Sequence, residues 1–325
     1  MKRHSGLALQ WLVAGLGVMI CSPGYAQNYP TKSVRLVVPF APGGSTDTPW
    51  RIVAPRLAEE LGQQVVIDNR PAAGSTVGAA IVAKSPADGY TLLGTSVSHV
   101  ISGALYRDLP YDALNDFVSI GQIADTSQVL VVHPALPVKT VAQLIALAKA
   151  KPGAIDYATS GSGTSQHLSY VLFTSLAGID MTHVPYKGSS QQIPDLIAGR
   201  VPTAFVGVSV VLPHVTSNRL RALGSGGSRR SPFMPDVPTI DESGLKGYKS
   251  NIPAGMLAPR GLPPEVMQRL EADLKKVMSR PDVQKGITAS GNEPIFDTGA
   301  NFNAMLKAES AKWGKLIRDL NIRVE

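Results

Sequence analysis

Short β-branched runs alternate with helical patterns along almost the whole chain. Eight such runs are predicted strands, and the segments between them repeat apolar residues at helical spacing. This alternation is typical of α/β architecture with largely parallel strands. The chain has 325 residues, 44% of them hydrophobic, which predicts two compact units with sizeable cores. The predicted strands cover residues 34–40, 64–68, 90–95, 128–133, 155–160, 182–186, 203–208 and 220–225.

The first residues form a separate segment. A basic start at Lys2 and Arg3 precedes an apolar run over residues 7–21 and small residues at positions 24–26. This is the pattern of a cleaved export signal, and the apolar run is shorter than the roughly 20 residues that a membrane-spanning anchor needs. We therefore predict that residues 1–26 are removed and that the mature protein lies in the periplasm.

The cysteine and charge content narrow the function classes. Cys21 is the only cysteine and lies in the predicted signal, so the mature chain is expected to form no disulfide. A lipid anchor at Cys21 is disfavoured because bulky Ile20 stands where lipoprotein signals carry a small residue. The net charge of +7 is spread along the chain, and basic residues gather no more closely than in adjacent pairs such as Arg229-Arg230. No nucleic-acid partner is expected from that distribution.

Several predicted helices have recognisable ends. One begins near Asp47 and ends at Gly62, where glycine suits a C-terminal cap. Another begins after a capping Thr140 and stops at Pro152. Two further helical patterns, over residues 263–287 and 301–320, carry apolar stripes that predict core-facing helices near the C-terminus.

The first predicted strand runs through a glycine turn into a helix. In "VVPFAPGGSTD", residues 37–47, Pro42-Gly43-Gly44 separates the strand from the helix that starts near Asp47. The first N–H groups of a helix are unpaired and carry partial positive charge, and glycine lets a ligand approach the backbone. The turn therefore predicts half of an anion site.

A second stretch repeats this arrangement. "YATSGSGTSQHL", residues 157–168, again joins a strand, a Gly/Ser/Thr turn and a helix. Either turn alone is more often structural than functional. Two of them, one in each half of an exported chain, predict a ligand held between two domains. Backbone N–H groups and hydroxyls suit a carboxylate.

Two residues in these turns allow more than one interpretation. Asp47 either caps its helix or meets an ammonium or hydroxyl of the ligand. His167 either contacts the ligand or supports its own loop. A hydrolase with a Ser165–His167 pair is the enzymatic alternative, and the absence of a nucleophile motif disfavours it. No dinucleotide fingerprint, phosphate loop or metal-ligand spacing occurs, so neither a cofactor nor a metal is expected.

Motifs in a consistent order extend through nearly the whole predicted mature chain, from Asn28 to Glu325. In this respect the chain resembles the Bug-type extracytoplasmic solute receptors of tripartite tricarboxylate transporters. The motifs are "YPTKSVRLVVPFAPGGSTD", "VVIDNRPAAGSTVGAAIVAKSPADGYTLL", "LPYDALNDF", "YATSGSGTSQHL", "THVPYKGSSQQIPDLIAGRV" and "LRALGSGGSRRSPFMPDVPT".

The resemblance implies a fold and a function. The expected fold is α/β, of the type II periplasmic binding protein class, with two lobes, a ligand cleft between them and two hinge crossovers. Residues 27–124 with 247–325 would form one lobe, and residues 125–246 the other. The expected function is capture of a small carboxylate and its delivery to integral-membrane transporter subunits, with a signalling receptor as the alternative. A monomer is the expected state.

The resemblance also implies which residues bind. In the family, the two glycine turns grip one carboxylate, partly through ordered waters. Ser98 and His99 are expected near the floor of the cleft. The full predicted ligand-binding set is Phe40, Pro42, Gly43, Gly44, Ser45, Thr46, Asp47, Ser98, Ser160, Gly161, Gly163, Thr164, Ser165, His167, Tyr186, Lys187 and Gly207.

Some positions depart from the family pattern. Gly207 and Val208 stand where relatives often have an Asp-Asn pair, and Ile252 lies where many have an aromatic residue. The far end of the site is therefore expected to be open and apolar. Lys187 has two interpretations: it pairs with a second ligand carboxylate, or it stabilises its loop from outside.

Overall fold

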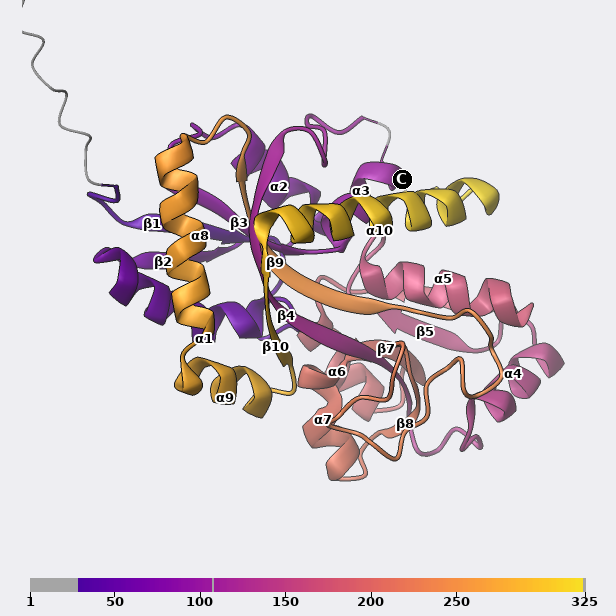
Figure 1. Ribbon diagram of the computed structural model, residues 1–325. Helices are drawn as coiled ribbons and strands as arrows, with labels where there is room; N and C mark the ends of the chain where they lie inside the picture. Colours follow the sequence, from indigo (N-terminus) through magenta and orange to yellow (C-terminus); the bar gives the residue numbers. More distant parts are fainter. Residues whose placement is uncertain (1–28, 107, 324–325) are drawn as a thin grey trace, which may run out of the picture.

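A first lobe and a second lobe, both α/β, lie side by side in the computed structural model, which describes residues 29–106 and 108–323 (Figure 1). The predicted signal, residues 1–26, lies outside the described residues. Strand β4 (Phe117–Val132) runs through both lobes. Within the described part of the chain, no helix is long and apolar enough to cross a membrane.

The sheet of the first lobe has the order β2-β1-β3-β9-β4, with β10 also paired to β4. Strands β1, β2 and β3 are mutually parallel, whereas β9 is antiparallel to both β3 and β4. The bounds are β1 Val34–Val38, β2 Val65–Asn69, β3 Thr91–Ser96, β9 Asn251–Pro259 and β10 Glu293–Thr298.

The sheet of the second lobe continues from the other half of β4. Its order is β4-β7-β5-β6, and β8 pairs with β4 on the other side. Strand β5 is parallel to β6 and β7, and β4 is antiparallel to β7. The bounds are β5 Asp156–Thr159, β6 Thr182–Pro185, β7 Thr203–Gly207 and β8 Arg221–Ser225.

The chain crosses between the lobes twice. Strand β4 pairs with β9 as far as Ser127 and with β7 from Gln128 onward, so the first crossover lies within β4. The return passage leads from the end of β8 at Ser225 to the start of β9 at Asn251. This confirms the α/β fold with two hinge crossovers; the lobe limits at residues 124/125 and 246/247 stay a prediction.

All eight predicted strands are present, but the sequence missed three strand segments. These are β9, β10 and the first half of β4, from Phe117 to Ser127. Two prolines and a glycine interrupt the β9 sequence "NIPAGMLAP", which hides a strand buried along almost its whole length. The predicted strand 203–208 ends at Gly207 because helix α7 begins at Val208.

Helices cover the sheets and meet at the lobe boundary. In the first lobe, α1 packs against α8 and α9, and α10 lies against α3 and β4 (Figure 1). Leu168 of α5, in the second lobe, belongs to the same buried cluster as Phe302 and Trp313 of α10, so apolar packing continues between the lobes. The bounds are α1 Asp47–Leu61, α2 Thr76–Ala83, α3 Ser98–Leu105, α4 Val141–Ala150, α5 Ser165–Ala177, α6 Ser189–Ile197, α7 Val208–Thr216, α8 Pro264–Met278, α9 Pro281–Ala289 and α10 Gly299–Asp319.

Candidate functional site

Four helices begin at one small cavity between the lobes, which we call the inner cavity. Two of them, α1 and α3, belong to the first lobe, and α5 and α6 belong to the second. Thr46 precedes α1, and Ser98, Ser165 and Ser189 are the first residues of the other three helices; all four line the cavity. Because the first N–H groups of a helix have no partner within it, four partially positive helix ends converge here.

The inner cavity is small and its lining is uncharged. Its volume is about 10 Å³, close to the space that one water needs, so the structure is a closed one. No acidic or basic residue occurs among the described residues that line the inner cavity. The lining residues are Phe40, Gly44, Ser45, Thr46, Ser98, Ser160, Ser165, Gln166, Ser189 and Ile252.

The first-lobe loop, residues 40–47, is held by the carboxylate of Asp47. Asp47 is fully buried and does not line the inner cavity. Its Oδ2 accepts hydrogen bonds from the Gly43 N–H (2.8 Å) and from Nε of Arg51 (2.5 Å), and its Oδ1 accepts one from Nδ2 of Asn69 (2.7 Å). Gly43 has φ 73°, a conformation that favours glycine. The acid therefore fixes the turn and does not cap α1 as expected, because α1 begins at Asp47 itself and has no side-chain cap hydrogen bond.

The second-lobe loop, residues 160–167, is held by neutral groups. Thr164 caps α5: its Oγ1 accepts from the His167 N–H and donates to the Gly161 carbonyl (2.7 Å). Nδ1 of His167 accepts from the Gly163 N–H (3.3 Å). The His167 ring therefore supports its own loop, which is one of the two roles expected of it, and it lies outside the inner cavity.

Two stacked histidines lie behind this second-lobe loop. The rings of His167 and His183 are 4.4 Å apart, and Nε2 of His183 is 2.7 Å from Oγ1 of Thr159. Burial, followed by repulsion from His183, lowers the pKa of His167 to about 3. Burial lowers the pKa of His183 to about 4. Both rings are therefore neutral near pH 7, and among the described residues His167 makes no hydrogen bond to a serine hydroxyl that would suggest a hydrolase.

Gln166 was missed by the sequence analysis, although it joins three parts of the second lobe. It is 1% exposed and lines the inner cavity. Its Oε1 accepts from the Ser160 N–H (2.8 Å) and from Nε2 of Gln192 (3.0 Å), while its Nε2 donates to Oγ of Ser189 (2.7 Å). Residues 189 and 192 come from α6, which no local pattern connects to this loop.

The two lobes touch directly around the inner cavity. The Ser165 N–H donates to Oγ of Ser98 across the lobe boundary (3.0 Å), and Oγ of Ser190 donates to the Pro42 carbonyl (3.0 Å). A Cβ at Gly207 would lie 2.2 Å from Oγ of Ser45. The expected opening at Gly207 is therefore absent, because Ser45 fills that space in the closed structure.

A larger chamber adjoins the inner cavity, and both share Phe40 and Ser160; we call it the outer chamber. Its volume is about 330 Å³, and residues from both lobes line it. Tyr186 and Lys187 are among them. The complete lining is Pro39, Phe40, Ala72, Gly74, Ser75, Tyr106, Ser160, Gly161, Ser162, Thr164, Pro185, Tyr186 and Lys187.

The structure thus sorts the predicted site residues into three groups. Phe40, Gly44, Ser45, Thr46, Ser98, Ser160 and Ser165 line the inner cavity. Gly161, Thr164, Tyr186 and Lys187 line the outer chamber, together with Phe40 and Ser160. Pro42, Gly43, Asp47, Gly163, His167 and Gly207 line neither space.

His99 does not form the cavity floor that was expected of it. The ring is fully buried in the first lobe, where Nε2 is 2.8 Å from the Ala113 carbonyl and the ring packs edge-on against Phe117. Burial lowers its pKa to about 4. Because it lines neither space, His99 has a structural role in this lobe.

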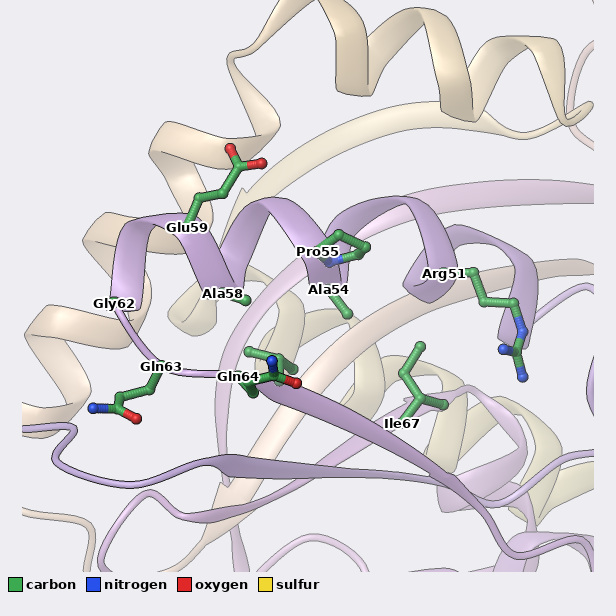
Figure 2. A pocket seen from close by; sticks show the side chains of 10 residues that line it. Arg51, Ala54, Pro55, Ala58, Glu59, Gly62, Gln63, Gln64 and Ile67 are labelled. Carbon is green, nitrogen blue, oxygen red and sulfur yellow. The ribbon is translucent and has the colours of Figure 1, made fainter.

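A further hollow lies away from the cleft. Figure 2 shows it between α1 and β2, with Pro55, Glu59 and Arg51 along the helix. Its volume is about 790 Å³, but only the first lobe lines it. No group of three or more possible metal ligands occurs among the described residues. The convergence of helix ends therefore makes the interlobe cleft the better candidate site.

Two lobes, two crossovers and a cleft lined by helix starts define the class of periplasmic solute-binding proteins. Residues 50–322 match the family model described as "Tripartite tricarboxylate transporter family receptor". The chain is 38% identical over 94% of its length to a UPF0065 protein of a Pseudomonas species, covering 93% of that protein. It is 33% identical over 97% of its length to the protein BugT of Bordetella pertussis, covering 98% of it.

Solved structures agree with this class. A Rhodopseudomonas palustris protein solved with adipate has a TM-score of 0.86 and 35% identity, with 91% of this chain and 99% of that one covered. MatC of the same species, solved with bound malate, has a TM-score of 0.85 and 28% identity, with coverage of 89% and 100%. The periplasmic binding protein BugD has a TM-score of 0.86 and 29% identity, with coverage of 91% and 100%.

The chain belongs to the tripartite tricarboxylate transporter receptor family and is a Bug-type periplasmic solute-binding receptor. This confirms the family and the fold expected from the sequence motifs. Receptors of this family and fold bind solutes and are not enzymes.

Proposed function

We propose that this receptor binds a small organic carboxylate between its lobes and delivers it to a membrane transporter. The observation that carries the proposal is the convergence of four helix N-termini on a cavity whose described lining is uncharged. Each helix end acts as roughly half a positive charge, and a carboxylate is small enough to contact several of them.

The same geometry disfavours a cationic ligand. A cation in the inner cavity would face four positive helix ends, and the nearby acid Asp47 is already occupied by Gly43, Arg51 and Asn69. Ser45 also lines the cavity, and its Oγ is buried without a hydrogen-bond partner among the described residues. A hydroxyl bonded to an anion forms a stronger, charge-assisted hydrogen bond. A carboxylate therefore satisfies both the helix ends and Ser45.

Two similar structures support a carboxylate ligand. One was solved with adipate and the other with malate. The match with this chain covers 99% and 100% of their respective lengths. Closure of the lobes around a ligand would support the proposed delivery. A ligand that contacts both lobes stabilises the closed form, and a membrane partner can distinguish the closed form from the open one.

A thermal-shift comparison of acids with their amides tests the binding proposal. The panel contains adipate, malate, citrate and benzoate with the matched amides. An acid present at about 100 times its dissociation constant should add roughly 2.7 kcal/mol of stability. Stabilisation by an acid and not by its amide supports the anion site. Equal shifts with acid and amide, or no shift with any acid in ligand-free protein, would overturn it.

An uptake assay tests delivery separately. Membrane vesicles containing the transporter subunits are given the radiolabelled acid that binds most tightly in the panel. Uptake is expected to require this receptor. Uptake that proceeds equally without it would contradict delivery and leave the carboxylate site standing.

A further inference from the structure

Helix α5 begins at the inner cavity with Ser165, and one turn further along it is bonded to both crossovers at Ser169. The first crossover supplies Gln128 of β4, whose Nε2 donates to Oγ of Ser169 (2.8 Å). The return passage supplies Ser250, whose hydroxyl contacts the same Oγ and accepts a second hydrogen bond from Nε2 of Gln128 (2.9 Å). All three side chains are fully buried. The two crossovers are therefore tied to each other and to α5 at one point.

The Ser169 hydroxyl is bonded to the cavity end of its own helix. It donates to the Ser165 carbonyl (2.6 Å), so the proton in the contact with Ser250 comes from Ser250. The Ser165 N–H donates across the lobe boundary to Oγ of Ser98 (3.0 Å). A continuous path of bonded groups therefore leads from the crossovers to the first turn of α5, and from there to the start of α3 in the first lobe.

The bond from Ser169 also acts on the anion site electrostatically. The Ser165 carbonyl and the Gln166 N–H belong to one peptide group, and this N–H lies in the first turn of α5, where it has no partner within the helix. A donor on the carbonyl polarises the peptide group and makes its N–H a stronger donor, because linked hydrogen bonds reinforce one another. Gln166 lines the inner cavity. The Ser169 hydroxyl therefore strengthens one of the N–H groups at the start of α5.

A second residue of the return passage holds the backbone of Ser169. The hydroxyl of Tyr248 donates to the Ser169 carbonyl (3.2 Å), so this serine is bonded to the crossovers through its hydroxyl and its carbonyl. The next side chain, Tyr170, is equally buried, but its hydroxyl donates to Oγ1 of Thr203 in β7, within the second lobe (2.7 Å). The bonds to the crossovers thus distinguish Ser169 from its neighbour on α5.

Movement of the lobes must act on these bonds. A two-lobed receptor opens by rotation of one lobe about its crossovers, and α5 moves with the second lobe. The crossovers are bonded to each other here as well: the Gly226 N–H donates to the Gln128 carbonyl, and the Ser250 N–H donates to the Gly226 carbonyl (2.7 Å each). A change in crossover geometry therefore shifts Gln128 and Ser250 relative to Ser169, and with it the first turn of α5.

We propose that Ser169 is a positioning residue for the anion site. Its bonds to both crossovers hold the first turn of α5 in the orientation that binds the carboxylate, so that acid binding and lobe closure depend on each other. This inference rests on the proposed function and deepens it, because it assigns the route that couples the cavity to the crossovers. Such coupling is reciprocal: crossovers that favour acid binding are in turn stabilised by the acid.

Titration calorimetry tests the effect on the acid. The probe is the acid among adipate, malate, citrate and benzoate that binds the wild type most tightly. Ser169→Ala should weaken its binding about tenfold, because the start of α5 loses both its tether and its polarised peptide group. Gln128→Met removes the other end of the same bond and should cause a similar loss. The double variant should lose no more than either single variant, since the two side chains act as one unit.

The matched control is Tyr170→Phe, which removes a buried, hydrogen-bonded hydroxyl from the neighbouring residue. It should lower the urea midpoint about as much as Ser169→Ala does and change the acid affinity by less than about twofold. This comparison separates a loss of general stability from a loss of positioning.

Hydrogen exchange of the crossover amides tests the reciprocal effect. In the wild type, a saturating concentration of the acid should slow exchange of the Gly226 and Ser250 N–H groups about tenfold. In Ser169→Ala, saturated with the same acid, this protection should fall below about threefold, whereas Tyr170→Phe should keep it. A purely structural role of Ser169 would lower stability and leave the acid-induced protection intact.

The outcomes separate this inference from the proposed function. Equal acid affinities in the wild type and Ser169→Ala, or equal losses in Ser169→Ala and Tyr170→Phe, would overturn the role of Ser169 while the carboxylate site stands. Unchanged crossover protection in Ser169→Ala would overturn it as well. Failure of all four acids to bind the wild type would overturn the proposed function, and the role of Ser169 with it.

Discussion

The two loops that face each other across the inner cavity have the same backbone plan and different supports. The first-lobe loop, residues 40–47, is held by a buried carboxylate with a guanidinium and an amide around it. The second-lobe loop, residues 160–167, is held by an amide, a hydroxyl and an imidazole. The charged carboxylate that holds the first-lobe loop, Asp47, does not line the cavity. The groups that hold the second-lobe loop are all neutral. Both arrangements leave the helix ends to determine which ligand charge is favoured.

The largest effect is expected from removing the charged support. Asp47→Ala leaves the Gly43 N–H and Asn69 without their acceptor and frees Arg51, which can turn to solvent. The loss should be about 3 kcal/mol of unfolding free energy. Urea denaturation measures it, with Asp47→Asn expected to lose less because it still accepts hydrogen bonds. A loss below about 1 kcal/mol would contradict the role given to Asp47.

A charge placed in the neutral support should act on binding instead. Gln166→Glu keeps the acceptor for the Ser160 N–H, and the Ser189 hydroxyl can turn to donate to the new carboxylate. Repulsion should weaken binding of the acid about a hundredfold, roughly 2.7 kcal/mol, and acidification should restore part of it.

Calorimetry on folded protein measures this change. Gln64→Glu, an exposed change beside β2, is the matched control and should bind as the wild type does. Unchanged affinity in Gln166→Glu would show that the ligand carboxylate lies elsewhere.

The second-lobe loop should also make stability sensitive to acid. His167 has its pKa lowered from 6.5 to about 3 by burial, so the folded state resists the proton that the unfolded chain accepts. The neutral His167 ring contributes its full stabilisation at pH values above 6.5, its pKa in the unfolded chain. This stabilisation is lost as the pH falls towards about 3, its pKa in the folded protein. We expect the free energy of unfolding to fall by about 2 kcal/mol between about pH 6.5 and about pH 5.

Denaturation at several pH values checks this expectation. His167→Gln cannot be protonated there and should flatten the pH dependence in part, because buried His183 and His99 also resist protonation and keep their share of it. An equally steep pH dependence in the variant would assign the effect to other groups.

A smaller effect is expected from the unpartnered hydroxyl of Ser45, a residue of the first-lobe loop that lines the cavity. Because Oγ of Ser45 has no partner, Ser45→Ala should leave stability nearly unchanged and weaken acid binding about tenfold. Ser225→Ala removes another buried, unpartnered hydroxyl that does not line the cavity, and it should change neither quantity. Equal acid affinities in the two variants would exclude Ser45 from the site.

The two loops at the inner cavity could be predicted from the sequence, because each glycine turn is a local pattern between a strand and a helix. Asp47 takes neither of the two roles assigned to it, because its carboxylate turns back to the Gly43 N–H and is held by Asn69, a residue distant in the chain. His167 takes one of its two roles, through the local hydrogen bond from the Gly163 N–H. Gln166 has no local signal, since its partners come from α6. Strand β9 was missed because its pairing with β3 and β4 outweighs its two prolines.

A crystal structure of the protein with adipate tests the central claim most directly. We expect one carboxylate in the inner cavity, within hydrogen-bond distance of Oγ of Ser45 and of N–H groups at the starts of α1 and α5, with no lysine or arginine beside it. Adipate seated in the hollow between α1 and β2, or bound in the cleft with neither of its carboxylates in the inner cavity, would contradict the account.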